Sequence, residues 1–338
     1  MRTTTRTLGL PAVLALAAVL AACGGGGSDD GKAAAAPSSA AAPSGSADAG
    51  GAPEVADLTV GVVPVIDHAA VYIANQEGFF EEEGLTVTPQ VMQGGAAALP
   101  AMVSGDLQAA FATYPSFFLA ESKGLGVTIV AEGIRATEKT GGVFVPGDSD
   151  IQDAKGLAGA TIAVNTLNNT GDVTIKAVLD EQGVDPASVK FVELAFPDMA
   201  PALERGDVDA AWLVEPFRTG VVANGGRMAL ASYSGVAEGI PVSGLAMTDE
   251  FVKENPNTAA AFARAIDKAN AFIADNPDSA REIVTTYSQT KPEVAAKLEL
   301  PEWRGGGVDA QEINRWNDLM ISTGALTKPV DITQLVEK

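Results

Sequence analysis

Polar side chains and glycines follow several strands that the sequence predicts, at positions where a small ligand could bind. Asp67 and the only histidine, His68, follow the first of these strands, and an Asn-Asn-Thr loop opens a helix after a later one. Carboxylate and amide oxygens accept hydrogen bonds from N–H groups, while free amides at a helix start bind anions or carbonyl oxygens. We therefore expect a binding site for a small polar solute formed by Asp67, His68, Gln93, Gly94, Gly95, Thr113, Tyr114, Asn168, Asn169, Thr170 and Glu215.

Each of these positions also has a purely structural interpretation. Asp67 would cap the helix that begins there, and His68 would lie in its first turn. The glycine pair would form a tight turn, the Asn-Asn-Thr loop would only cap its helix, and Tyr114 would pack in the core. Glu215 would be a solvated loop acid, and Trp212, inside the strand that Glu215 ends, is expected in the core.

The composition excludes several classes of chemistry. The chain of 338 residues has one histidine and one cysteine, too few for a zinc site of His and Cys ligands or for an intramolecular disulfide. It contains no P-loop and no G-x-S-x-G motif, and the acids at 148, 150 and 153 lack the spacing of an EF-hand. The 43 acids against 22 bases give a net charge of −21, which repels phosphate backbones. We therefore expect no cofactor, no metal, no catalytic residue and no nucleic-acid partner.

The start of the chain predicts export. Residues 1–22 carry two arginines ahead of an uncharged apolar run that is short for a membrane-spanning helix, as in a signal peptide. The run ends in Leu-Ala-Ala-Cys23, which resembles the lipobox of bacterial lipoproteins and implies a lipid on Cys23; an ordinary signal peptide with an incidental cysteine is the alternative. Residues 23–56, rich in Gly, Ala, Ser and Pro, predict a flexible tether. We expect a protein held by its lipid on the extracytoplasmic face of the cell membrane.

The rest of the chain predicts two α/β units followed by helices. Alternation of apolar strands with helices favours largely parallel sheets covered by helices. The expected strands are 58–63, 85–91, 107–113 and 127–131 in the first unit, 160–164, 189–194, 208–214 and 228–231 in the second, and 242–247 after them. Residues 68–80 are expected to form one helix, and 133–158 a turn-rich stretch. The expected C-terminal helices are 258–275, 279–287, 292–298 and 310–323.

Five segments resemble a known family. They are DHAAVYIA at 67–74, EGFFEEEGLTV at 77–87 with the glycine pair after it, LPAMVSGD at 99–106, DAAWLVEPF at 209–217 and the stretch 255–268. Together they resemble the lipid-anchored solute-binding proteins of ABC importers, in the nitrate, sulfonate, taurine and thiamine-pyrimidine group. The G-F-F-x-x-x-G-L piece is the most specific of them.

The resemblance implies the type II periplasmic-binding-protein fold, an α/β fold of two lobes joined by two hinge crossovers, with the ligand between the lobes. Lobe 1 would comprise 57–144 and 240–338, including the C-terminal helices, and lobe 2 would comprise 145–239. The crossings are expected near 142–147 and 239–244. Placement of the ligand in the cleft agrees with the rule that open parallel sheets bind ligands beyond the carboxyl ends of their strands.

The expected function is capture of a small polar organic solute, nitrogen- or sulfur-containing, and its delivery to a membrane permease with its ATPase. The protein is expected to be a monomer and not an enzyme. Asp67 and Glu215, together with His68 and Tyr114, favour a neutral or amine-bearing organic solute, such as a heteroaromatic pyrimidine, over a bare inorganic anion. The alternatives are a surface sensor or adhesion lipoprotein on the same fold, and an enzyme like the thiamine-pyrimidine synthase. That enzyme uses a cysteine-rich loop and iron, whereas this chain has its one cysteine at the export junction.

Overall fold

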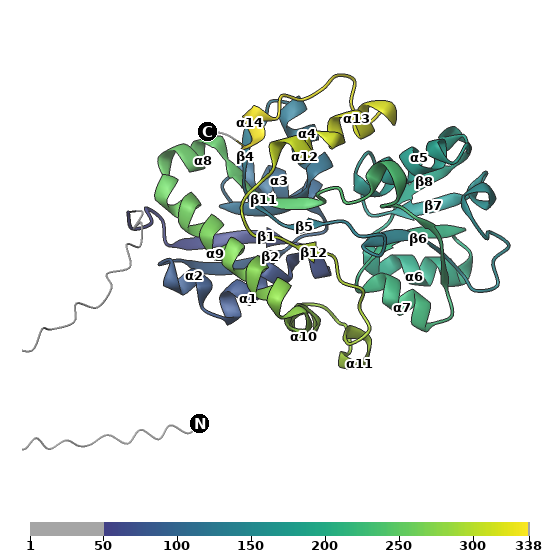
Figure 1. The fold of residues 1–338 in the computed structure, drawn as a ribbon, viewed down its shortest axis with the longest axis horizontal. Coiled ribbons are helices and arrows are strands. Elements are labelled where there is room, and N and C mark those ends of the chain that lie inside the picture. Colours follow the sequence, from purple (N-terminus) through teal and green to yellow (C-terminus); the bar gives the residue numbers. More distant parts are fainter. Residues whose placement is uncertain (1–50, 337–338) are drawn as a thin grey trace, which may run out of the picture. The chain divides into compact units, whose positions relative to one another are not determined.

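The computed structural model describes residues 51–336 of the chain (Figure 1). The predicted signal peptide, Cys23 and most of the predicted tether lie outside the described residues. Within 51–336, no helix combines the length and the apolar character needed to cross a membrane.

A first five-stranded sheet, called sheet I here, has the strand order β2-β1-β3-β11-β4. Its middle strands are apolar and buried on both faces, as expected where helices cover both sides of a sheet. Strand β1 pairs in parallel with β2 and β3, while β11 runs antiparallel to β3 and β4. The strands are β1 Asp57–Val62, β2 Thr86–Val91, β3 Ala109–Thr113, β4 Val127–Glu132 and β11 Ser243–Thr248.

Sheet II has the order β10-β6-β9-β7-β8 and repeats the topology of sheet I. Strand β7 pairs in parallel with β8 and β9, and β6 runs antiparallel to β9 and β10. Strands β6 and β11 thus hold equivalent places, each entering one sheet directly after the chain leaves the other. The strands are β6 Gly141–Val145, β7 Thr161–Val164, β8 Lys190–Glu193, β9 Ala210–Val214 and β10 Arg227–Ala231.

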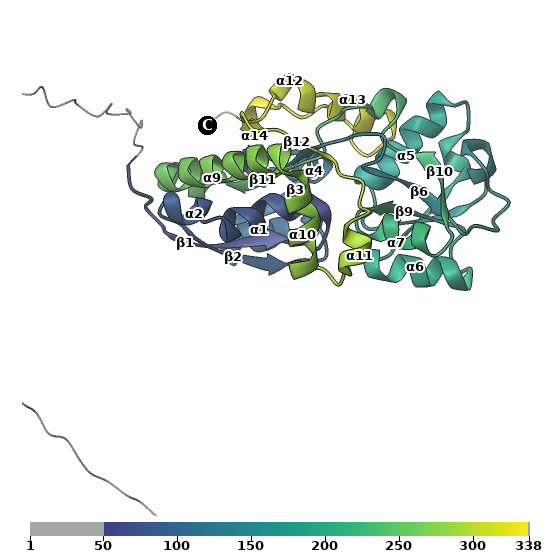
Figure 2. The ribbon, with the colours of Figure 1, turned by 60° about the horizontal axis from the view of Figure 1, so that its bottom comes forward.

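Helices surround both sheets. Those up to β4 are η1 Ile66–His68, α1 Ala69–Gln76, α2 Phe79–Glu82, α3 Gly95–Val103 and α4 Tyr114–Ser122. Those between β6 and β11 are η2 Ala154–Leu157, α5 Thr170–Glu181, η3 Pro186–Ser188, α6 Phe196–Arg205, α7 Phe217–Ala223 and η4 Gly235–Ala237. The C-terminal ones are α8 Asp249–Glu254, α9 Pro256–Asp275, α10 Pro277–Tyr287, α11 Pro292–Ala295, α12 Ala310–Ile313, α13 Arg315–Ser322 and α14 Thr333–Val336. Figure 2 shows the long α9 beside α1 and α2 of the first unit, which it contacts.

The chain crosses between the sheets twice. The first crossing precedes Gly141, upstream of the expected 142–147, because the residues from Gly141 pair with β9 as strand β6. This strand was missed in the turn-rich stretch, where its two glycines masked a short buried run. In the two connecting segments, the Ala136 amide donates to the Ile240 carbonyl at 2.9 Å and the Val242 amide to the Ile134 carbonyl at 2.8 Å. A short strand β5, Ile134–Arg135, also pairs with β12, Glu302–Trp303, of the C-terminal part.

Three local predictions differ from the structure. The helix expected over 68–80 is divided into η1, α1 and α2, and it breaks at Gly78, which has a φ of 77°. The last predicted helix is divided into α12 and α13. The end of the predicted tether is attached to the fold, since the Glu54 carboxylate accepts from the Thr258 amide at 2.9 Å and the Val55 amide donates to the Thr258 hydroxyl at 3.0 Å.

Candidate functional site

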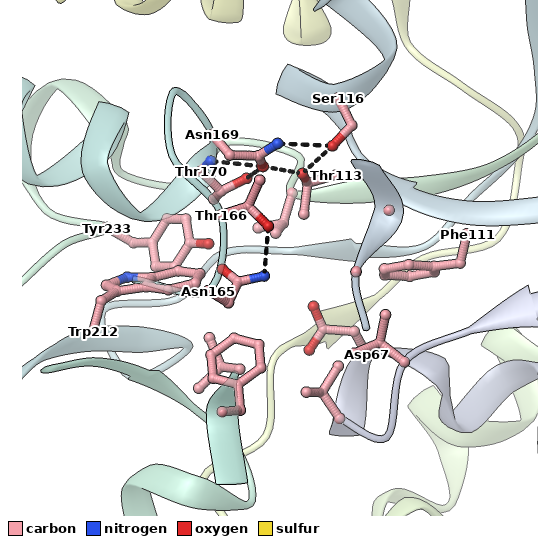
Figure 3. A pocket seen from close by; sticks show the side chains of 17 residues that line it. Asp67, Phe111, Thr113, Ser116, Asn165, Thr166, Asn169, Thr170, Trp212 and Tyr233 are labelled. Atoms are coloured by element: carbon pink, nitrogen blue, oxygen red, sulfur yellow. Dashed lines mark hydrogen bonds between the residues drawn. The ribbon is translucent and has the colours of Figure 1, made fainter. Parts of the chain in front are cut away.

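The carboxyl ends of the parallel strands of both sheets face one cavity (Figure 3). The centre of a water molecule can reach a volume of about 40 Å³ inside the cavity. By the same measure, a single bound water needs roughly 10–15 Å³. The lining residues from the sheet I side are Val63, Val65, Asp67, Gly94, Gly95, Phe111, Thr113, Ser116 and Val242. Those from the sheet II side are Asn165, Thr166, Asn169, Thr170, Phe196, Trp212, Val214 and Tyr233. A molecule held here would touch both halves of the structure at once.

Asp67 supplies a buried carboxyl group to this cavity. It is 7% exposed, and its Oδ1 atom has no hydrogen-bond partner among residues 51–336. Burial raises the pKa of Asp67 to about 7, although a hydrogen bond from its own backbone lowers it. The helical turn there begins after Val65 without any side-chain cap, so Asp67 does not cap the helix. Figure 3 shows the carboxyl group directed into the cavity, opposite Asn165.

Tyr233 supplies the matching group from the sheet II side. Its ring is fully buried, and its hydroxyl has no hydrogen-bond partner within the described residues. Burial and then the charge of Asp67 raise the pKa of Tyr233 well above its usual value. Two buried polar groups from opposite halves of the structure therefore face the cavity, each leaving a hydrogen bond unmade.

An aromatic wall closes the sheet II side of the cavity. Trp212 donates from Nε1 to the Ser232 hydroxyl at 2.9 Å, which fixes its indole ring. Phe196 packs against it with ring centroids 5.9 Å apart. Trp212 is only 3% exposed, as expected for a core residue, but it also lines the cavity. The wall offers a flat apolar surface to a ring or an alkyl group.

Asn169 joins the two halves of the structure beside the cavity. It caps α5, because its Oδ1 accepts from the Thr170 amide at 2.8 Å while Asp172 accepts from the Asn169 amide at 2.8 Å. The same Oδ1 accepts from the Thr113 hydroxyl at 2.7 Å, and Nδ2 donates to the Ser116 hydroxyl at 2.8 Å. Asn169 was predicted to contact the ligand. Most of its hydrogen bonds instead cap α5 or join it to Thr113 and Ser116 on the sheet I side (Figure 3).

The glycine pair brings the start of α3 close to its neighbours. A side chain at Gly95 would place Cβ 2.6 Å from the Cβ of Ala112, so only glycine fits. A Cβ at Gly94 would lie 3.4 Å from the Thr166 hydroxyl and 3.7 Å from the Asn165 amide of the other half. Gly94 and Gly95, at the start of α3, both line the cavity.

Two predicted residues lie behind the cavity instead of lining it. The His68 ring is fully buried under Phe111, with ring centroids 3.5 Å apart, and accepts a hydrogen bond from the Val63 amide at 3.3 Å. Burial holds the pKa of His68 well below its usual value, so the imidazole is neutral. Tyr114 packs in the core of sheet I, as its structural interpretation stated, with its ring edge-on to Phe117.

Glu215 is fully buried and does not line the cavity. Both predictions for it, a contact with the ligand and a solvated loop acid, are therefore wrong. Its carboxylate accepts from the Thr219 hydroxyl at 2.7 Å and from the Glu299 amide at 3.0 Å, and Arg218 lies 3.5 Å away. Its carbonyl oxygen accepts from the Ile66 amide at 3.1 Å. Burial raises the pKa of Glu215, and these hydrogen bonds lower it. Glu215 therefore ties the end of β9 to α7, to η1 and to the C-terminal segment.

Of the remaining predicted residues, two line the cavity and two do not. Gln93 and Asn168 are exposed and do not line the cavity, and Asn168 has a φ of 54° at the turn before α5. Thr113 and Thr170 do line it. The sequence analysis missed Ser116, Asn165, Thr166, Phe196 and Tyr233 at the cavity. Asn165 and Thr166 directly follow β7, so the rule used for the other strands identifies them, whereas nothing local to Tyr233 marks it.

Metal binding finds no support in the described part of the chain. Residues 51–336 bring together no group of three or more His, Cys, Asp or Glu side chains that could hold an ion.

Comparison with known proteins gives a consistent picture. The family model described as "NMT1/THI5 like" matches residues 65–280. The chain is 22% identical over 300 residues to the putative binding protein YtlA of Bacillus subtilis. The alignment covers 84% of this chain and 87% of YtlA. It is 24% identical over 284 residues to the formylaminopyrimidine-binding protein of Halalkalibacterium halodurans, covering 78% of this chain and 85% of that protein.

A solved structure shows the same fold. The alkanesulfonate-binding protein SsuA from Xanthomonas axonopodis pv. citri, solved with bound MOPS, superposes with a TM-score of 0.70 at 16% identity, over 83% of this chain and 98% of that one. The predicted α/β fold of periplasmic binding proteins is thereby confirmed.

Proposed function

Because the chain belongs to the NMT1/THI5-like family, we propose that it is the solute-binding component of an ABC importer. It captures a small polar organic solute, such as a pyrimidine, an amine or a sulfonate, and delivers it to a membrane permease driven by an ATPase. Sheet I with the C-terminal helices forms lobe 1, and sheet II forms lobe 2 from Gly141 to about residue 239.

The observation that supports this most directly is the pair of unmade hydrogen bonds across the cavity. Asp67 Oδ1 belongs to lobe 1 and the Tyr233 hydroxyl to lobe 2, and both are buried without a partner among the described residues. Leaving a buried polar group unpaired costs about 1–3 kcal/mol. A solute that bonds to both groups offsets this cost only while the lobes are together, so its binding favours the closed form.

Closure is a hinge motion. The two connecting segments pair with each other through short backbone hydrogen bonds and with β12, so lobe 2 can rotate about a narrow, well-ordered strip. A permease that contacts both lobes would then recognise the loaded protein by the arrangement of its two surfaces. The protein acts as a monomer, held by a lipid on Cys23 at the extracytoplasmic face of the membrane, with residues up to about 53 as the tether.

Binding without catalysis fits the residues at the cavity. No hydroxyl group among the described lining residues is hydrogen-bonded to a histidine, lysine or carboxylate base, the arrangement that activates a nucleophile. The one histidine is neutral and lies behind Phe111. Asp67, with a pKa of about 7, is the one acidic or basic side chain among the described lining residues, and no lining hydroxyl is bonded to it as an activated nucleophile would be.

Small-angle scattering combined with native mass spectrometry tests this function. Mass spectrometry of the protein purified without unfolding should detect a carried small molecule. Adding that molecule to stripped protein should lower the radius of gyration. A radius that stays constant at saturation would exclude capture by closure, and co-purification with no permease or ATPase would favour a sensor.

A further inference from the structure

The charge of the cavity comes from one side chain. Of the 17 residues that line it, all within the described part of the chain, Asp67 alone is acidic or basic. The other polar groups are neutral hydroxyls and amides: Thr113, Ser116, Asn165, Thr166, Asn169, Thr170 and Tyr233. Asp67 makes no ion pair with a basic residue of 51–336. The cavity therefore carries a single carboxyl group whose charge no lining residue balances.

We propose that the solute presents a positively charged nitrogen to Asp67, as an ammonium, an amidinium or a protonated amino-heterocycle does. The proposal rests on the proposed function and specifies the solute class: cationic nitrogen compounds are selected over sulfonates, carboxylates and nitrate. Asp67 determines this specificity by direct contact.

The physical reason is the cost of burying an unpaired carboxylate. An ionised carboxylate without a partner is strongly unfavourable in a site of low polarity. A cationic N–H donor supplies both the missing charge and the missing hydrogen bond to Oδ1, and bonds between charged partners are about twice as strong as neutral ones. An anionic solute would add a second negative charge within a few ångströms of the first, where repulsion is weakly screened.

The start of α5 reaches the same cavity, and helix N-termini favour anions. The amides at this end are already bonded, because Asp172 lies in its first turn and accepts from the Asn168 and Asn169 amides at 3.1 and 2.8 Å, while Lys176 pairs with Asp172 at 2.8 Å. The Thr170 amide is also bonded, to Asn169 Oδ1. An anion would thus find α5 occupied.

The start of α3 has a different role. The glycine pair at this start lines the cavity, and its amides can donate to a neutral acceptor of the solute such as a ring nitrogen or a carbonyl oxygen. The Trp212 and Phe196 rings offer an apolar face to the remainder. The site is thus complementary to a compact cation that also carries an acceptor or a flat apolar part.

Three probes with the same heavy-atom frame separate charge from shape: acetamidinium, acetamide and acetate. Their dissociation constants are measured by calorimetry on the full chain, stripped of carried solute, at pH 8 and constant ionic strength. We expect acetamidinium to bind at least tenfold more tightly than acetate, with acetamide between them. In Asp67→Asn, which keeps the shape of the side chain, acetamidinium should lose at least tenfold and its advantage should disappear. Asp150→Asn, which alters an exposed acid, should change nothing.

The results decide clearly. Acetate binding as tightly as acetamidinium, no binding of any of the three probes, or an acetamidinium advantage that survives Asp67→Asn overturns the cationic assignment. If Asp67→Asn does not fold, the comparison of the three probes on the unaltered protein still decides. None of these results affects the capture function, which fails separately if scattering detects no closure with the carried solute.

Discussion

Asp67 opposes folding when it is ionised. Its pKa is raised from 3.8 to about 7, chiefly by burial, so between these values the folded state holds a proton that the unfolded state has lost. The contribution of Asp67 to stability then falls as the pH rises from about 4 to about 7, and it stays at the lower level above that range. Its titratable neighbours are His68, Tyr233 and Tyr287. The buried imidazole of His68 stays neutral, whereas in the unfolded chain it takes up a proton below about pH 6.5; its contribution to stability therefore rises with pH and opposes that of Asp67.

We predict that Asp67→Asn removes this dependence. The variant should be more stable than the unaltered protein at pH 8, by up to about 4 kcal/mol, the free energy that corresponds to a pKa raised from 3.8 to about 7, and nearly equal at pH 4. Urea denaturation of solute-free protein at several pH values measures the difference. Equal stabilities at pH 8 would mean that water or movement of the side chain solvates the carboxylate.

Glu215 has a different role from Asp67, although both are buried acids that follow strands. All of its observed bonds go to the protein, including those from the Thr219 hydroxyl and the Glu299 amide. We predict that Glu215→Ala destabilises the fold by about 1–3 kcal/mol for each buried group left unpaired. Glu215→Gln, which retains an acceptor oxygen, should lose less. Denaturation and solute affinity are measured together, and a normal stability with a lost affinity would instead make Glu215 a ligand contact.

At the scale of elements, most strands were predictable, apart from β6 and the short β5 and β12, and the side chains that converge at the cavity were predictable only in part. Apolar runs such as Val127–Glu132 and Ala210–Val214 mark buried strands by composition alone. The ends of three other predicted strands, now β1, β2 and β7, indicated Asp67, the glycine pair and Asn169. Glu215 satisfied the same rule but turns into contacts with α7 and the C-terminal segment. Thr219 is only four residues away, but Glu299 lies far along the chain, and that distant contact could not be read from the sequence around Glu215.

Helix α5 packs against strand β9 so closely, where Gly171 meets Trp212, that no side-chain atom fits between them. A Cβ on Gly171, in the first turn of α5, would lie 2.9 Å from Cδ2 and Cε3 of Trp212. We predict that Gly171→Ala pushes the indole ring and costs about 1–3 kcal/mol, as overpacking does. Gly220→Ala in α7, where a Cβ would meet nothing within 4 Å, is the control. Thermal unfolding and the tryptophan emission spectrum report the two effects, and an unchanged Gly171→Ala protein would show that the Trp212 wall is adjustable.

At the scale of the whole folded part, the closed arrangement is supported by hydrogen bonds between the proposed lobes that need no solute. Asn169 of lobe 2 bonds to Thr113 and Ser116 of lobe 1 at 2.7 and 2.8 Å. Each such bond contributes about 0.5–1.5 kcal/mol. We therefore expect these bonds to favour the closed form in the free protein, so that a solute needs less differential affinity to complete the shift.

Removing these bonds from the lobe 1 side leaves the α5 cap intact. We predict that Thr113→Val combined with Ser116→Ala enlarges the radius of gyration of the solute-free protein and weakens solute binding about 5- to 100-fold, the effect of two such bonds. Ser122→Ala, on the same helix but bonded only to the Leu119 carbonyl, should alter neither quantity. If the double variant binds less tightly with an unchanged radius, the two hydroxyls contact the solute directly. If both quantities stay at their original values, the bonds of Thr113 and Ser116 to Asn169 contribute nothing to closure, and the solute and other bonds between the lobes, such as those of Glu215 to Ile66 and Glu299, must supply it.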